Sequence, residues 1–158
     1  FGVTGGVMEA ALRSAYYLLK KENPPVDAFK AVRSPSFQAN EGVMEAEFAI
    51  DDVTVKTAVV SGLGNTRRLL QKIERGEVHY DFVEVMACPG GCVGGGGPIN
   101  DGKELAFCRG GNLYDLDDNA DIRFSHENKD VLAMYEEYFE APMSHKAHML
   151  LHTEHSAK

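Results

Sequence analysis

Cys88 and Cys92 are the residues whose types and spacing most clearly suit chemistry. A proline and two glycines, residues 89–91, separate them, and these residue types disfavour a helix between the two thiols. The pair must therefore lie in a loop that wraps around something. Thiolates bind metal ions and iron–sulfur clusters, so this spacing favours a metal or cluster site.

Glycines dominate the same loop. Six of the 16 glycines in the chain lie between residues 84 and 98. Glycine permits close approach of the backbone and positive φ, and it leaves amide N–H groups free to point at an anion. An iron–sulfur cluster suits such a loop, because backbone amides can donate to its sulfides and tune its potential.

Three other interpretations of the loop stay open from the residues alone. A disulfide between Cys88 and Cys92 would be tight and is unfavourable in a reducing compartment. A phosphate-binding glycine loop would want a lysine or a helix start and would not need two cysteines. The third interpretation is that both cysteines are structural residues of a flexible loop.

The composition excludes several functional classes. Three cysteines do not indicate a secreted disulfide framework, so we predict a reducing, cytoplasmic environment. The net charge of −8 argues against a nucleic-acid-binding protein. No apolar run approaches the roughly 18 residues that suggest a membrane span. Cys108, outside the loop, is expected to be a buried small hydrophobe.

Two other clusters carry weaker metal signals. His148 and His152 have the i, i+4 spacing of zinc ligands, but no acidic helper stands between them, and packing is their expected role. The acidic run 115–121 lacks the glycine and terminal glutamate of an EF-hand. We expect that run to be a solvated face.

The elements that must position the loop can be predicted in outline. The 158 residues suffice for one domain with a core. Thr4 is the predicted cap of a first helix, which the prolines at 24–25 stop. Its predicted inner face consists of Met8, Leu12, Ala15 and Leu19, widened by Ala11 and Leu18.

Strands at 43–50 and 53–60 form a predicted hairpin, and a third strand at 81–86 leads into the cysteines. A helix capped by Asn65 or Thr66 and ended by Gly76 precedes the third strand. Its predicted inner residues are Leu69, Leu70 and Ile73.

Three more helices complete the prediction: one at 112–118, one from a Ser125 cap to residue 139, and one from a Ser144 cap to residue 151. The inner residues of the second are predicted to be Val131, Leu132, Tyr135, Tyr138 and Phe139. This order predicts an α/β fold, a small mixed sheet flanked by helices. The functional loop follows the carboxyl end of a strand, where open α/β sheets place their ligands.

Residues 84–98 closely resemble the third signature of the iron-only ([FeFe]) hydrogenases, in which glutamate, methionine, alanine and two cysteines precede a glycine run. Residues 1–11 resemble the family stretch that follows the second signature, and residues 58–65 resemble the approach to the third. The tail, from the Ser-His-Glu-Asn at 125–128 to residue 153, resembles the small-subunit-like carboxyl terminus. The resemblance covers essentially the whole chain.

The resemblance implies one lobe of a two-lobed catalytic domain at 1–100 and a helical small-subunit-like tail at 101–158 packed on that lobe. It implies an enzyme that interconverts protons, electrons and dihydrogen at an H-cluster, a [4Fe–4S] cluster joined to a di-iron subcluster. It also implies a ferredoxin-like or NAD(P)-linked electron carrier as partner.

Site residues follow from the same resemblance. Cys88 matches a ligand of the [4Fe–4S] cluster, and Cys92 matches the cysteine that bridges the cluster to the di-iron unit. Met86 matches a methionine packed against that unit, and Phe1 aligns with an aromatic residue close to it. The cofactor-binding residues are Cys88, Cys92, Gly90 and Gly91.

Two of the four expected thiolates are missing here. The family's first two cysteine signatures do not occur in these residues, so the N-terminal half of a hydrogenase is the implied partner. We expect the fragment alone to lack the complete cofactor and to be inactive. The alternative function is a hydrogenase-like iron–sulfur protein of cluster assembly or sensing. Gly97 stands where the family usually has glutamine, and its presence weakens the expectation of full catalytic activity.

Overall fold

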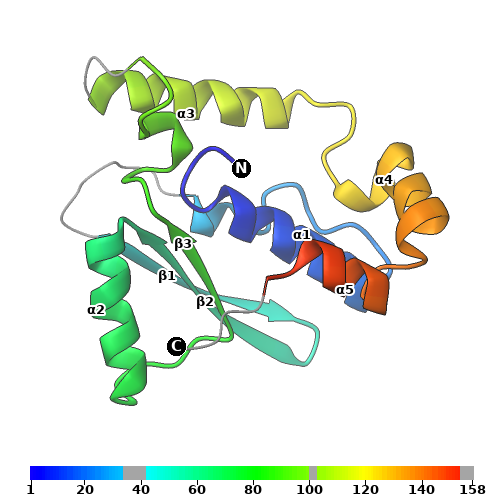
Figure 1. Cartoon of the computed structure of the whole chain (residues 1–158), viewed down its shortest axis with the longest axis horizontal. Helices are drawn as coiled ribbons and strands as arrows, with labels where there is room; N and C mark the ends of the chain where they lie inside the picture. The colour runs from blue at the N-terminus through cyan, green and yellow to red at the C-terminus, as the bar shows by residue number, and fades with distance from the viewer. Residues whose placement is uncertain (34–41, 100–102, 154–158) are drawn as a thin grey trace. The chain divides into compact units, whose positions relative to one another are not determined.

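The structure is a computed structural model that describes residues 1–33, 42–99 and 103–153. The chain divides into two compact units, residues 1–120 and 121–158, which are described separately (Figure 1). No helix in the described part of the chain is both long and apolar enough to span a membrane.

A three-stranded mixed sheet organises the first unit. Strands β1 (Val43–Ile50) and β2 (Val53–Ser61) form the antiparallel hairpin, and β3 (Phe82–Met86) runs parallel to β2. Helix α2 (Leu63–Glu74) makes the crossover from β2 to β3. The predicted α/β class and the small mixed sheet are confirmed.

Helices cover both faces of this sheet (Figure 1). On one face, Met8 and Leu12 of α1 (Gly6–Lys20) and Val32 of the short helix η1 (Lys30–Val32) pack with Phe48 and Ile50. On the other face, Leu69 of α2 packs with Ala58 and Val60 of β2. Strand β2 alternates between the two clusters, as the twofold repeat of strand side chains requires.

The start and the inner face of α1 differ from the prediction. Gly5, with φ 95°, is the N-cap, and the Thr4 hydroxyl caps nothing. The buried stripe runs in steps of four through Met8, Leu12 and the half-buried Tyr16. Leu18 and Leu19, both predicted to be inside, are exposed, so those two assignments were wrong.

Helices α2 and α3, unlike α1, begin earlier than predicted. Gly62 rather than Asn65 or Thr66 precedes α2, and Leu70 is exposed. Helix α3 spans Lys103–Asp118 instead of 112–118. Cys108 lies on this helix and is exposed, so the prediction that it is buried was wrong.

The second unit is helical. It contains η3 (Ser125–Glu127), α4 (Lys129–Met134), a π-helical turn η4 (Tyr135–Phe139) and α5 (His145–Leu151). The Asn128 side chain, not Ser125, caps α4, whereas Ser144 caps α5 as predicted, through its Oγ and the Ala147 amide at 3.0 Å. Of the predicted inner residues, Phe139 is buried and Val131 and Tyr135 are half-buried, but Leu132 and Tyr138 are exposed.

Candidate functional site

The two cysteines lie in the segment that β3 delivers from the sheet, residues 87–99, which we call the cysteine loop. Both thiols are free, with Cys88 half-buried and Cys92 exposed. The disulfide interpretation is therefore not what the structure contains. Met86, half-buried, is the last residue of β3 and accepts a hydrogen bond from the Gly62 amide on its carbonyl at 2.7 Å.

Short-range hydrogen bonds shape the cysteine loop. The Gly91 amide donates to the Cys88 carbonyl at 2.9 Å, and the Gly95 amide donates to the Cys92 carbonyl at 3.0 Å. Between these turns, Gly90 and Gly91 both have positive φ, and a single turn of 3-10 helix, η2 (Cys92–Gly94), follows. Glycine adopts such φ values without a steric penalty, which explains why the loop needs glycine at 90 and 91.

Residues 1–5, the N-terminal segment, lie against the cysteine loop. The Thr4 amide donates to the Gly90 carbonyl at 3.2 Å, and the Gly2 carbonyl accepts from the Val93 amide at 3.1 Å. The loop and this segment touch at Gly91, where a Cβ atom would stand 2.5 Å from the Gly2 carbonyl oxygen. The backbone of residues 2–4 is thus in direct contact with the backbone of residues 90–93.

A buried carboxylate secures the other end of the N-terminal segment. Glu84, on β3, is only 7% exposed, and its two oxygens accept from the Gly5 and Met8 amides, each at 2.6 Å. These amides belong to the first turn of α1, where N–H groups have no partner within the helix. Glu84 therefore accepts hydrogen bonds from the amides at the start of α1, the role predicted for the Thr4 hydroxyl.

Space next to the Cys88 thiol depends on glycine. A Cβ atom at Gly95 would stand 3.2 Å from the Cys88 Sγ, which is tighter than ordinary contact. Two free thiols in one glycine-lined loop suit part of an iron–sulfur site. Among the described residues no group of three or more histidine, cysteine or acidic side chains could hold a metal.

Phe1 lies at the end of the N-terminal segment with 78% of its surface exposed. The structure thus brings Met86, Cys88, Gly90, Gly91 and Cys92 into one strand and loop, with the backbone of the Phe1 segment beside them. The described residues leave the Phe1 side chain largely exposed.

Gly97 lies where a side chain would meet nothing. A Cβ atom there has no heavy atom within 4 Å, and its φ is not in the left-handed region. We expect Gly97→Gln to keep or slightly raise the free energy of unfolding, by up to about 1 kcal/mol, since a side chain restricts the unfolded chain at no steric cost. Urea unfolding followed by circular dichroism measures this change, and a loss above about 1 kcal/mol would contradict it.

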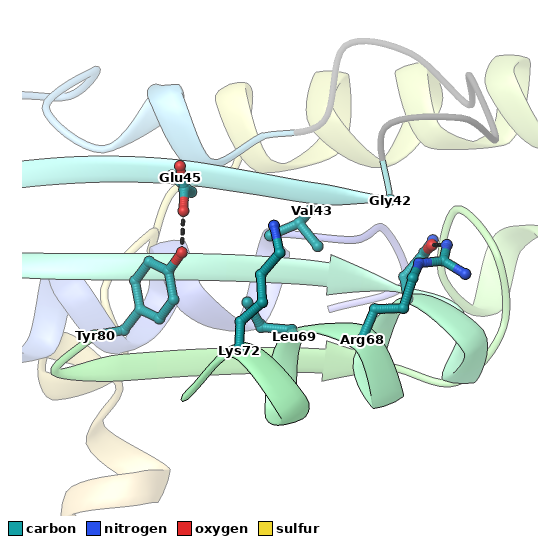
Figure 2. Close-up of a pocket in the computed structure, with 8 residues that line it drawn as sticks. Gly42, Val43, Glu45, Arg68, Leu69, Lys72 and Tyr80 are labelled. Atoms are coloured by element: carbon teal, nitrogen blue, oxygen red, sulfur yellow. Dashed lines mark hydrogen bonds between the residues drawn. The ribbon is translucent and has the colours of Figure 1, made fainter. Parts of the chain in front are cut away.

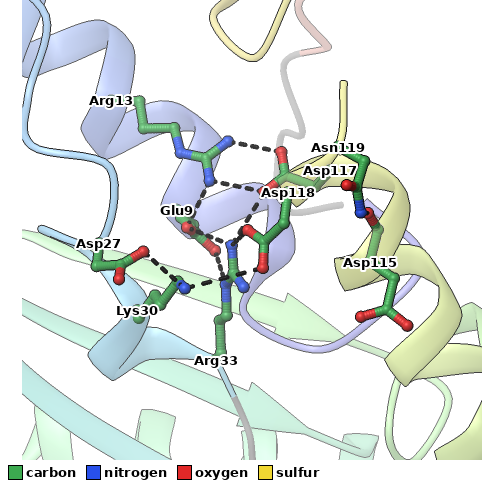
Figure 3. Close-up of polar contacts among 9 residues, drawn as sticks. All are labelled: Glu9, Arg13, Asp27, Lys30, Arg33, Asp115, Asp117, Asp118 and Asn119. Carbon is green, nitrogen blue, oxygen red and sulfur yellow. Dashed lines mark hydrogen bonds and ion pairs between the residues drawn. The ribbon is translucent and has the colours of Figure 1, made fainter. Parts of the chain in front are cut away.

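One residue of the acidic run, Asp117, belongs to a network of ion pairs that the sequence did not indicate. Asp117 is not on a solvated face, because its carboxylate accepts from Arg13 at 2.9 Å and from Arg33 at 3.0 Å (Figure 3). Glu9, which is buried, accepts from the same two guanidinium groups at 2.7 and 2.6 Å. The i, i+4 spacing of Glu9 and Arg13 was the only local signal for this network.

The network favours the charged state of its arginines. The hydrogen bond to Asp117 and the charge of Glu9 raise the pKa of Arg13 in spite of burial. Burial lowers the pKa of Arg33, but the hydrogen bond and charge of Glu9, together with the charges of Asp118 and Asp117, outweigh that effect and raise the pKa. The Arg33 guanidinium also lies 4.4 Å from the centre of the Tyr114 ring.

We expect Asp117→Asn to lower the free energy of unfolding by about 2 kcal/mol, between the values for exposed and buried ion pairs. The matched control is Asp51→Asn, which removes the exposed ion pair with Lys20. This control should change the free energy of unfolding by less than about 1 kcal/mol. Chemical denaturation of both variants measures the difference. Equal losses would show that the network contributes no more than a surface pair.

A separate hollow of about 370 Å³ lies between the sheet and α2 (Figure 2). Its lining includes Arg68 and Lys72 of α2, and the Tyr80 hydroxyl donates to Glu45 at its wall. Burial, together with that carboxylate, raises the pKa of Tyr80 to about 12. None of the residues that line this hollow belongs to the cysteine loop. The weaker metal candidates are His148 of α5 and His152, which directly follows that helix, and their stacked rings have centres 4.8 Å apart.

Comparison with known proteins places this geometry in context. Residues 1–96 match the family described as iron only hydrogenase large subunit, C-terminal domain, and residues 103–158 match iron hydrogenase small subunit. The chain is 44% identical over 155 residues to the NADP-reducing hydrogenase subunit HndD of Solidesulfovibrio fructosivorans, covering 97% of this chain and 26% of that protein.

Two other relatives are informative. A solved structure of [FeFe]-hydrogenase HydA1 from Chlamydomonas reinhardtii has 36% identity and a TM-score of 0.74, covering 98% of this chain and 45% of that one. The cytosolic Fe-S cluster assembly factor narfl of Xenopus tropicalis is 31% identical over 156 residues, covering 99% of this chain and 32% of that protein. The chain thus spans about a quarter of the length of HndD and about a third of the length of narfl.

Proposed function

Because this chain belongs to the iron-only hydrogenase family, we propose that it is part of an [FeFe]-hydrogenase and contributes to the reversible reduction of protons to dihydrogen. The observation that carries this proposal is the cysteine loop. It presents two free thiols, and backbone contacts with the N-terminal segment hold the residues between them.

In this proposal Cys88 and Cys92 would supply two thiolates for a [4Fe–4S] cluster, and the Cys92 thiolate would also serve a di-iron subcluster. When bound, this H-cluster supplies the electron transfer and the hydrogen chemistry. The chain's own residues shape its surroundings. Gly95 leaves room beside the Cys88 thiol. Met86 and Phe1 are proposed to provide an apolar boundary for the cofactor.

The remaining two thiolates must come from outside these residues, from an N-terminal half of the protein. Exposed apolar side chains on β3, Phe82 and Val85, are consistent with a surface that such a half covers. We propose residues 1–100 as the cluster-binding lobe and 101–158 as the tail packed on it. An NAD(P)-linked or ferredoxin-like carrier would deliver electrons, and free thiols favour a cytoplasmic location.

The test is to compare this chain alone with the same chain joined to its upstream coding sequence. Each is loaded anaerobically with the cofactor, and hydrogen evolution is measured with a reduced viologen dye. We expect activity from the longer protein and none from the 158-residue chain. No activity from the loaded longer protein would contradict the proposal.

A second candidate is a cluster-assembly protein without hydrogen chemistry. The 31% identity to the Xenopus assembly factor, over nearly the whole of this chain, favours it. Infrared absorption separates the two candidates, because carbon monoxide and cyanide bound to a di-iron unit give bands that a plain [4Fe–4S] cluster lacks. Bands in the loaded longer protein support the hydrogenase, and their absence supports the assembly protein.

A further inference from the structure

We propose that Glu84 is a positioning residue for the cysteine loop. Its buried carboxylate fastens the start of α1 to β3, and the fastened N-terminal segment in turn fixes the backbone between Cys88 and Cys92. The inference rests on the proposed function only in treating this loop as the one that binds the cluster.

The first step is the attachment of α1. Glu84 Oε1 accepts from the Gly5 amide and Oε2 from the Met8 amide, both at 2.6 Å. Gly5 has no side chain to cap the helix, so a residue 79 positions away supplies both acceptors. A carboxylate suits this place, because the amino end of a helix carries partial positive charge.

The second step runs from the N-terminal segment to the loop. Directly before Gly5, the Thr4 amide donates to the Gly90 carbonyl, and two residues earlier the Gly2 carbonyl accepts from the Val93 amide. These two bonds attach on either side of Gly91. Displacing the segment would therefore release the backbone that separates the two thiols.

The third step is a hydrogen bond between the sheet and the cysteine loop. The Gly90 amide donates to the Ser61 Oγ at 2.7 Å, and Ser61 is the last residue of β2. Gly90 is thus held on both of its backbone polar groups, by Ser61 through its amide and by Thr4 through its carbonyl. The Glu84 attachment, through the N-terminal segment, and the Ser61 bond therefore act on the same residue of the loop.

Glutamine at position 84 is the sharpest change. It has almost the shape of glutamate, but one oxygen becomes an NH₂ group, and that donor would face a backbone amide donor. One of the two bonds is then lost and replaced by a repulsive contact. The control is Glu47→Gln, the same chemical change at an exposed residue of β1 whose carboxylate pairs with Lys56.

The first readout is alkylation of the metal-free chain by iodoacetamide, followed by mass spectrometry. Cys88 is half-buried, and Cys108 on α3 serves as an exposed internal reference. In Glu84→Gln we expect Cys88 to react about fivefold faster or more, the change that loss of one hydrogen bond produces. Cys108, and both cysteines in Glu47→Gln, should stay within about twofold of the original chain.

The second readout needs no variant and decides the question even if Glu84→Gln does not fold. In the unaltered chain, amide hydrogen exchange is followed by NMR at Met8, Thr4 and Val93. If the three amides exchange with the same dependence on denaturant concentration, the start of α1, the N-terminal segment and the cysteine loop open as one cooperative unit, which supports the proposal. Exchange of Val93 at least about tenfold faster than Met8 shows that the loop opens without the helix attachment and overturns the proposal.

These results are distinguishable from a failure of the proposed function. Alkylation and exchange involve no iron, so they can support the role of Glu84 even if the longer protein evolves no hydrogen. Conversely, an active longer protein whose Glu84→Gln variant leaves Cys88 reactivity unchanged overturns the role of Glu84 alone.

Discussion

Cys92→Ser in the longer protein is expected to lower hydrogen evolution by at least about 100-fold, since changes that only support a metal ligand already cost 10–100-fold. Serine keeps the size of the side chain but is a poor ligand for iron, and Cys92 is the residue proposed to join the two halves of the cofactor. Gas chromatography of hydrogen and iron analysis of the purified protein measure the effect together.

The matched control for this change is Cys108→Ser, because Cys108 is equally free and exposed but lies on α3. Its activity and iron content should stay within about twofold of the original protein. Equal losses in both variants would show that the effect is not specific to the cysteine loop. Full activity in Cys92→Ser would remove Cys92 from the proposed site.

Gly91→Ala is expected to lower the free energy of unfolding by about 2–5 kcal/mol, the sum of backbone strain and overpacking. Gly91 has φ 100° and ψ −173°, a region that is essentially restricted to glycine. A Cβ atom there would lie 2.5 Å from the Gly2 oxygen and 2.8 Å from the Thr4 nitrogen. Both contacts are with backbone, which cannot rotate away as a side chain can.

Gly96→Ala is the matched control, because a Cβ atom at Gly96 meets nothing within 4 Å. It should keep the free energy of unfolding or raise it by up to about 1 kcal/mol, as expected for Gly97→Gln. Urea denaturation of the chain itself measures both variants without any cofactor. A loss in Gly91→Ala no larger than that in Gly96→Ala would show that the close approach of loop and N-terminal segment is not required.

The sheet could be predicted from the sequence because its signals are local. Alternating apolar residues at 43–50, two aspartates and a β-branched run specify the β1–β2 hairpin, which the structure contains with Phe48 and Ile50 buried. The absence of helix between the cysteines followed equally from residue types alone. These elements depend on neighbours in sequence, so one sequence suffices to find them.

The support of the loop could not be predicted in the same way. Glu84 lies within the cysteine signature, but its partners are 76 and 79 positions away, at the start of α1. Thr4 is a residue type that favours the N-cap position, but a remote carboxylate accepts from the first amides of the helix instead. Capping rules describe a helix in isolation, and here the tertiary contact decides.

Helix α3 shows how packing overrides propensity. Gly110 and Gly111 disfavour helix, and the predicted element began directly after them, at residue 112. In the structure the helix continues through both, and a Cβ atom at Gly110 would already be in contact with Val3. A small residue at that point lets α3 approach the N-terminal segment, which repays the weaker helix propensity.

The arginine network makes two sequence families one folding unit. Asp117 lies in the region matched to the small subunit, whereas Arg13 and Arg33 lie in the region matched to the large subunit. The compact unit accordingly ends at Ala120 and not at the boundary between the two matches. A protein cut between residues 96 and 103 would leave Arg13 and Arg33 paired with Glu9 but separated from Asp117, the second carboxylate that they share. The two pieces would need to associate before the ion pairs of Asp117 with Arg13 and Arg33 could form.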